Sequence, residues 1–173
     1  MQALKEVQFM KSDGFIAISR PDARVLVLGT LPGKKSLELN EYYAQPRNVF
    51  WRIMGEIFAF SPDLPYADRT LRLNENRIAL WDVCASAYRP GSLDAKLSNV
   101  VANDFSAFFD EHRAIKLICF NGAKADKLYR SRVLPGLPLP IAQIPTQLLP
   151  STSPAHAAMP FDEKLSRWRT ALG

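Results

Sequence analysis

The chain has 173 residues, of which 47% are hydrophobic and 23% are charged, and these are the proportions of an ordinary globular protein. A chain of this length can bury a core without a disulfide or a structural metal, so we predict a single domain over residues 1–173. Lys and Arg number 22 against 17 Asp and Glu, a formal net charge of +5. This charge fits a polyanionic partner such as nucleic acid but does not require one.

The cysteines, histidines and apolar runs argue against several classes of protein. Cys84 and Cys119 each lie at the end of an apolar run, which predicts two buried thiols. There is no Cys-x-x-Cys pair, and His112 and His156 are far apart, so we expect no metal site and no cofactor. No apolar stretch reaches about 18 residues and no signal-peptide pattern is present, so we expect a cytoplasmic protein with no membrane partner.

Continuous apolar runs predict strands that are buried on both faces of a sheet. In chain order these runs are residues 25–28, 77–84 and 115–120, and residues 147–150 predict a short fourth strand. A shorter apolar run at residues 15–18 predicts an edge strand or a packed arm. Gly29 closes the first of these runs, and Asn121 and Gly122 close the third.

Apolar residues at helical spacing predict helices between these strands. Amphipathic helices are expected at residues 48–60, 100–112 and 160–172, and a basic helix is expected at 123–132. Asn48 is the expected N-cap of the first of them. The other connections are residues 63–76 (helix or loop), 85–99 (a long connection) and 135–140 (a proline-rich loop).

Strands that alternate with helices predict the α/β class, here a three-layer α/β/α sandwich around a mostly parallel four-stranded sheet. Right-handed crossovers bring the carboxyl ends of parallel strands to one edge, which is where open α/β sheets bind ligands. We therefore expect one site formed by residues 29–36, 82–89, 121–122 and 151–156.

The turn after the first strand is the part of this site richest in small residues, with Gly29, Thr30, Leu31, Pro32 and Gly33. A nucleotide phosphate loop needs one more residue before its Gly-Lys pair, and Pro32 lacks a backbone N–H. A plain structural turn is the simpler interpretation, and a small-nucleotide enzyme stays open as an alternative. The aromatic, amide and basic side chains of residues 42–51 follow, and they suit a flat heterocycle on a phosphate chain.

Six segments in order carry a resemblance to a known family. They are Gly-x-x-Pro-Gly at 29–33, Tyr-Tyr-x-x-Pro-Arg-Asn-x-Phe-Trp at 42–51, Leu-Trp-Asp-Val at 80–83, Gly-Ser-Leu-Asp at 91–94, Phe-Asn-Gly at 120–122 and Ser-Thr-Ser-Pro-Ala at 151–155. Together they resemble the uracil-DNA glycosylase superfamily, and within it most closely the DNA-deoxyinosine (hypoxanthine-DNA) glycosylases. The resemblance implies a uracil-DNA glycosylase-like fold and a monofunctional hydrolase of base-excision repair that releases hypoxanthine from DNA.

The chain departs from the superfamily pattern at two positions. Leu31 stands where most members have the Asp or Asn that orients water, and Ser151 stands where many have His. Uracil release is therefore expected to be feeble. In the deoxyinosine subgroup the proposed catalytic amide falls on Asn48, which becomes the expected catalytic residue, and Asp82 is a second group that could orient water.

The resemblance and the residue types together predict the other contacts. Base and substrate binding is expected from Gly29, Thr30, Leu31, Pro32, Gly33, Tyr43, Phe50 and Asn121. DNA binding is expected from Arg47, Arg89, Lys124, Ser151, Ser153, Pro154, Ala155 and His156, although for the three basic residues a solvated surface charge is the simpler interpretation.

The expected partner is double-stranded or single-stranded DNA that contains deaminated bases. We expect a monomer that associates with the nucleoid when it is bound to DNA. The alternative is a DNA-binding protein that recognises lesions without cutting them, because the motif-one carboxamide is missing.

Overall fold

A computed structural model describes residues 10–90 and 96–173. The Gly-Ser-Leu-Asp motif at 91–94 lies outside the described residues. Within the described part of the chain, no helix has the length and apolar character needed to cross a bilayer.

A four-stranded parallel sheet forms the centre of the fold. Its strands are β2 (Val25–Gly29), β3 (Ile78–Asp82), β6 (Leu117–Asn121) and β7 (Thr146–Leu149), in the order β3-β2-β6-β7. All three neighbouring pairs are parallel. The four strands expected from the apolar runs are therefore confirmed, with ends that differ by a few residues.

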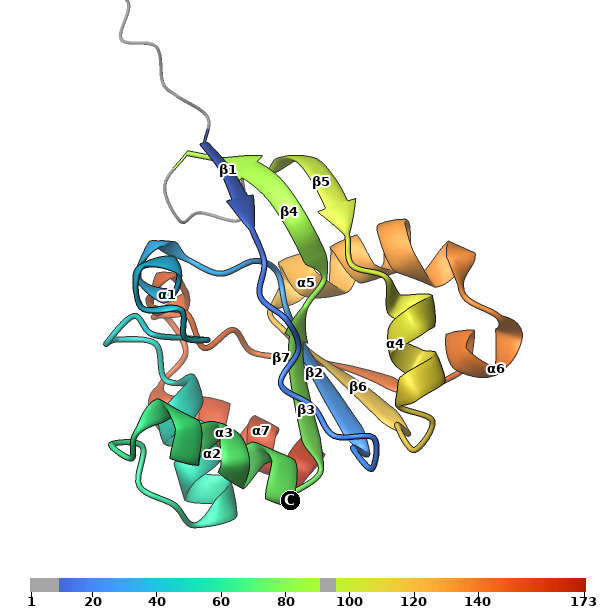
Figure 1. Ribbon diagram of the computed structural model, residues 1–173. Helices are drawn as coiled ribbons and strands as arrows, with labels where there is room; N and C mark the ends of the chain where they lie inside the picture. The colour runs from blue at the N-terminus through green and yellow to red at the C-terminus, as the bar shows by residue number, and fades with distance from the viewer. Residues whose placement is uncertain (1–9, 91–95) are drawn as a thin grey trace, which may run out of the picture.

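Helices cover both faces of this sheet (Figure 1). On one side lie α2 (Phe50–Phe58), α3 (Tyr66–Glu75) and α7 (Phe161–Leu172). On the other lie α4 (Phe105–Glu111) and α5 (Ala123–Leu128). The expected three-layer α/β/α sandwich is confirmed. Its first expected helix starts later than predicted, because Val49 and not Asn48 is the N-cap of α2.

Short helical pieces complete the connections. The basic helix predicted at 123–132 is α5 followed by a π-helix η2 (Tyr129–Val133) and a 3-10 turn η3 (Leu134–Gly136). The predicted proline-rich loop contains part of α6 (Leu139–Ala142). The other short elements are α1 (Lys34–Leu39) and η4 (Pro154–His156).

A second sheet contradicts the prediction that residues 85–99 are only a connection. It is antiparallel, in the order β1-β4-β5, and consists of β1 (Met10–Asp13), β4 (Cys84–Arg89) and β5 (Ser98–Ala102). The strand β4 alternates small and polar residues, and β5 is largely exposed, so neither shows the apolar run of a doubly buried strand. Because β5 extends to Ala102, the helix predicted at 100–112 begins only at Phe105, with Asp104 as its N-cap.

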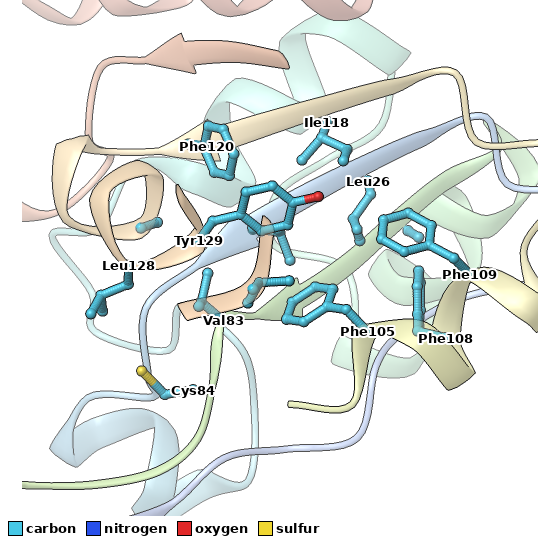
Figure 2. Close-up of a cluster of buried hydrophobic side chains, with 14 of the residues drawn as sticks. Leu26, Val83, Cys84, Phe105, Phe108, Phe109, Ile118, Phe120, Leu128 and Tyr129 are labelled. Atoms are coloured by element: carbon cyan, nitrogen blue, oxygen red, sulfur yellow. The ribbon is translucent and has the colours of Figure 1, made fainter. Parts of the chain in front are cut away.

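The alternation of side chains along each central strand supplies two cores. Leu26 and Leu28 point to the α4–α5 side, whereas Val27 points to the α2–α7 side. In the first core the ring of Tyr129 packs against Phe120, with 5.2 Å between ring centroids (Figure 2). Burial raises the pKa of the Tyr129 phenol to about 12.

Both cysteines are buried, as expected from their apolar runs. Cys84 belongs to the first core and Cys119 to the second. Burial raises the pKa of the Cys119 thiol to about 12, so it stays protonated and unreactive at neutral pH.

Candidate active site

The carboxyl ends of all four central strands border one cleft with a volume of about 690 Å³. The lining residues include the turn after β2, Asp82 after β3, Asn121 at the end of β6 and the loop 151–155 after β7. The segment between α1 and α2 adds Tyr43, Arg47 and Asn48. The structure thus brings together at one edge the segments that the sequence predicts there.

Gly29 forms part of the cleft because it has no side chain. A Cβ atom at this position would lie 2.5 Å from Asp82 Oδ1 and 2.7 Å from Tyr43 Oη. Pairing continues past the strand ends, because Val83 N–H donates to Gly29 O (2.9 Å). The carboxylate of Asp82, a residue only 3% exposed, and the phenol of Tyr43 are therefore fixed against one glycine.

The turn 29–33 is braced by a buried arginine. Arg89 lies on β4, is 4% exposed and donates a guanidinium hydrogen bond to the carbonyl of Pro32. The interpretation of Arg89 as a solvated surface charge is therefore wrong. Arg89 also borders the cleft, but the guanidinium N–H that binds Pro32 is directed at the protein backbone.

Asn48 lines the cleft with its carboxamide oxygen anchored. Asn48 Oδ1 accepts the Phe50 N–H (3.0 Å), so it satisfies the first amide of α2 from one residue before the N-cap. The Asn48 N–H donates to Gln45 O (2.9 Å), and the next N–H, of Val49, donates to Thr152 O (3.1 Å). The atom that accepts the Phe50 N–H must be the amide oxygen, because an NH₂ group cannot accept it. The NH₂ group is therefore the other end of this carboxamide at the cleft wall.

The carboxamide of Asn121, which lines the cleft, makes hydrogen bonds to Thr152 and keeps one N–H and one lone pair for another partner. Asn121 Oδ1 accepts the Thr152 N–H, and Asn121 Nδ2 donates to Thr152 Oγ1, both at 2.9 Å. Thr152 is 1% exposed, and its carbonyl accepts the Val49 N–H. A chain of hydrogen bonds therefore runs from the end of β6 through Thr152 to the residue after Asn48, and Asn121 holds Thr152 in place.

Replacing Asn121 is expected to loosen this chain. Asn121→Ala leaves the buried Thr152 N–H and hydroxyl without these partners, which costs about 1–3 kcal/mol and lowers Tm by roughly 2–9 °C in a chain of this size. In Asn121→Asp the acceptor for Thr152 N–H remains, and the threonine hydroxyl can rotate to donate to the carboxylate. We expect a smaller loss, measured by thermal unfolding; equal Tm values for Asn121→Ala and the unmodified chain would contradict the assignment.

The loop 150–156 is held at both ends by α7. Trp168 Nε1 donates to Pro150 O (3.0 Å), and Lys164 Nζ donates to His156 O (2.7 Å). Within the loop, Ser151 Oγ accepts the Ser153 N–H (3.2 Å). Trp168 and Lys164 are four residues apart on one face of the helix, so α7 fixes the shape of this loop.

The serines of this loop and the residues after them were predicted to bind DNA. Ser153 Oγ accepts the Ala155 N–H (3.2 Å), so both serine hydroxyls are internal acceptors, although each keeps a proton to donate. Ser151, Ser153, Pro154 and Ala155 line the cleft. His156 is exposed and is not among the lining residues.

Tyr42 and Tyr43 are the aromatic residues that line the cleft, and Phe50 lies behind Tyr43. The two ring centroids are 4.3 Å apart with an interplanar angle of 32°. Phe50 is fully buried and does not reach the cleft, so the expectation that it stacks directly on a base is wrong. The backbone of Tyr43 has a φ of +55°, which turns this side chain out of the α1–α2 connection.

Tyr42 anchors the same segment in the core. Its hydroxyl donates to Ile16 O (2.9 Å), and its carbonyl accepts from Trp51 Nε1 (2.8 Å). Burial first, and then the negative charge of Asp82, hold the pKa of the Tyr42 phenol above its usual value. This phenol is therefore a fixed neutral donor that positions Tyr43 beside it.

Two of the basic residues predicted to contact DNA differ in where they lie. Arg47 is exposed and lines the cleft, whereas Lys124 lies on α5 and is not among the lining residues. Lys164, which was not predicted, is 4% exposed. Lys164 lies four residues before Trp168, so the sequence could have placed both side chains on the same face of the last helix. In residues 10–90 and 96–173, no group of three or more His, Cys, Asp or Glu side chains is arranged to hold a metal ion.

Three comparisons with known proteins agree with this architecture. The family model described as "Uracil DNA glycosylase superfamily" matches residues 16–172. Two curated relatives, both named "Hypoxanthine DNA glycosylase", are 37% identical to this chain. The one from Methanosarcina acetivorans aligns over 131 residues, 70% of this chain and 83% of the relative, and the one from Methanosarcina barkeri aligns over 117 residues, 67% and 74%.

A solution NMR structure from Methanosarcina acetivorans, described as a candidate uracil DNA glycosylase, superposes with a TM-score of 0.80. It is 33% identical and covers 94% of this chain and 97% of its own. The fold and the site, together with these relatives, define a DNA glycosylase, a hydrolase that acts on DNA. The chain belongs to the uracil DNA glycosylase superfamily.

Proposed function

We propose that this protein removes hypoxanthine from deoxyinosine in DNA by hydrolysis of the N-glycosidic bond, with feeble activity on uracil. The observation that carries the proposal is the anchored Asn48 carboxamide at the wall of a cleft whose motif-one turn presents Leu31. The name of the curated relatives supports hypoxanthine as the base. We expect a monomer that acts on duplex DNA in the cytoplasm.

The chemistry requires the damaged nucleotide to leave the stack, the base to be held, and a water to reach the anomeric carbon. The transition state resembles an oxocarbenium sugar with a departing purine anion. Asn48 is a weak base, but a fixed carboxamide can orient water or hydrogen-bond the leaving base. Tyr43, supported by Phe50, supplies the face on which the flipped base stacks.

Asp82 supplies a way to recognise deamination. A carboxylate only accepts hydrogen bonds, and Asp82 lies at the cleft beside Gly29. Deamination of adenine to hypoxanthine converts ring atom N1 from an acceptor into an N–H donor. An ionised Asp82 would therefore attract hypoxanthine N1–H and repel the lone pair of adenine N1.

The test uses duplex oligonucleotides that each contain one deoxyinosine, deoxyuridine or deoxyadenosine, with enzyme in excess and alkaline cleavage of the abasic product. We expect rapid release from deoxyinosine, slow release from deoxyuridine and none from deoxyadenosine. Tight binding to lesions without any release over hours would overturn the proposal and would support a lesion-binding protein that does not cut.

Asp82→Asn is expected to lower the rate of hypoxanthine release by about 10- to 100-fold, the usual effect of losing one good base contact. The ratio of the deoxyinosine rate to the deoxyadenosine rate should also fall. An amide can donate as well as accept, so it no longer repels adenine N1. The measurement is this ratio of single-turnover rates. Asp110→Asn, at an exposed carboxylate of α4, is the control; an unchanged ratio in Asp82→Asn would remove Asp82 from base recognition.

A further inference from the structure

A second cavity of about 250 Å³ lies beside the cleft and shares four lining residues with it, Arg47, Thr152, Ser153 and Pro154. The far side of this cavity is formed by the start of α7 and the residues before it, including Met159, Phe161 and Lys164. The shared wall means that an occupant of the second cavity would be a direct neighbour of an occupant of the cleft.

Lys164 gives this cavity a buried positive charge. The residue is 4% exposed, and its Nζ donates to His156 O at 2.7 Å. Within residues 10–90 and 96–173, no carboxylate forms an ion pair with it. A buried cation is costly unless an anion or several hydrogen bonds compensate it, and the ammonium group has two further N–H donors. Burial also lowers the pKa of Lys164.

Arg47 adds a second cation at the shared wall. It is exposed, and none of the ion pairs found in residues 10–90 and 96–173 includes it. A guanidinium binds phosphate oxygens in a bidentate manner. Ser153 contributes a hydroxyl, whereas Met159 and Phe161 contribute apolar surface. Two cations next to apolar side chains match a phosphate attached to a deoxyribose better than they match a free base or an acidic peptide.

We propose that this second cavity binds the sugar–phosphate unit next to the flipped nucleotide on the same DNA strand, with its phosphate between Lys164 and Arg47. This phosphate site rests on the function proposed above, the removal of a base from DNA. In this arrangement Lys164 has two roles, because one hydrogen holds the His156 carbonyl and the others face the phosphate.

The first experiment measures the affinity for a duplex with an uncleavable abasic-site analogue between about 50 and 200 mM salt. Loss of one phosphate contact reduces the slope of log K against log salt by about 0.9. We expect this reduction in Lys164→Met and its recovery in Lys164→Arg. Arg167→Met is the matched control, because Arg167 is an exposed cation of the same helix that pairs with Glu163 (2.7 Å); its slope should equal that of the unmodified chain.

The second experiment replaces each phosphate near the lesion, one at a time, by a neutral methylphosphonate. The unmodified protein should lose affinity most at one position flanking the lesion, and Lys164→Met should show no further loss there. If Lys164→Met does not fold, as judged by circular dichroism, Arg47→Met undergoes the same scan. Inorganic phosphate is added in a separate arm; competition by free phosphate as strong as that by DNA would overturn the sugar–phosphate assignment.

The outcomes separate this proposal from the proposed function. Weaker binding by Lys164→Met with an unchanged salt slope and an unchanged methylphosphonate profile would overturn the phosphate site and would leave Lys164 only as the donor to His156. Hypoxanthine release by the unmodified protein is measured in parallel. A reduced slope without any base release would uphold the phosphate site while contradicting the glycosylase substrate.

Discussion

Asn48→Ala is expected to lower the rate of hypoxanthine release by about 10²- to 10³-fold, the usual effect of removing one fixed donor from a developing anion. The fold should persist, because the change removes one acceptor from Phe50 N–H at the start of α2. Single-turnover rates on a deoxyinosine duplex measure the loss, and circular dichroism checks the fold. An unchanged rate in a folded variant would remove Asn48 from the mechanism.

Asn48→Asp separates the two ends of the carboxamide. The carboxylate still accepts the Phe50 N–H but has no NH₂ group to donate. Because the amide oxygen of Asn48 is already in contact with that N–H at 3.0 Å, we expect the NH₂ end to act on the leaving base and Asn48→Asp to be as inactive as Asn48→Ala. A rate at or above that of the unmodified chain would instead assign Asn48 the role of orienting water.

Gly29→Ala is expected to reduce base release by about 10²-fold or more, because a displacement of about 1 Å at a reacting site can have this effect. The new Cβ would lie 2.5 Å from Asp82 Oδ1 and 2.7 Å from Tyr43 Oη, so both must move. Overpacking of this kind also destabilises by about 1–3 kcal/mol. Rates on deoxyinosine duplexes and urea unfolding measure the two effects.

Gly136→Ala is the matched control for this change. No atom lies within 4 Å of the position its Cβ would take, so the same substitution adds a methyl group in open space. We expect normal base release and unchanged or slightly higher stability. If Gly29→Ala behaved like Gly136→Ala, the close approach of Asp82 and Tyr43 to Gly29 would have no role in activity.

The central sheet and its edge could be predicted because doubly buried strands leave a plain signal in the sequence. The runs that became β2, β3 and β6 are largely apolar and buried, whereas β7 has the sequence Thr-Gln-Leu-Leu and is only partly buried. The antiparallel sheet could not be found in this way, because the strand β4 has the sequence Cys-Ala-Ser-Ala-Tyr-Arg. In a sequence, such a run of small and polar residues cannot be distinguished from a loop that connects two strands.

The sequence predicted which segments form the candidate site better than it predicted what each residue in them contacts. An asparagine at a strand end can make hydrogen bonds to a ligand or to the protein, and Asn121 makes both of its hydrogen bonds to Thr152. Phe50 and Arg89 were expected to touch DNA, but burial directs them to Tyr43 and Pro32. Residue type predicts which hydrogen bonds are available, whereas the tertiary structure decides which partner receives them.

The two donors of α7 also make the loop 150–156 depend on the last helix that the structure describes. Pro150 and His156 receive their hydrogen bonds from Trp168 and Lys164, which follow the loop in the chain. A nascent or truncated chain that lacks α7 could still form the four-stranded sheet, yet its loop would have neither support. Activity would then appear only after synthesis has passed α7, so partly made chains would not excise bases.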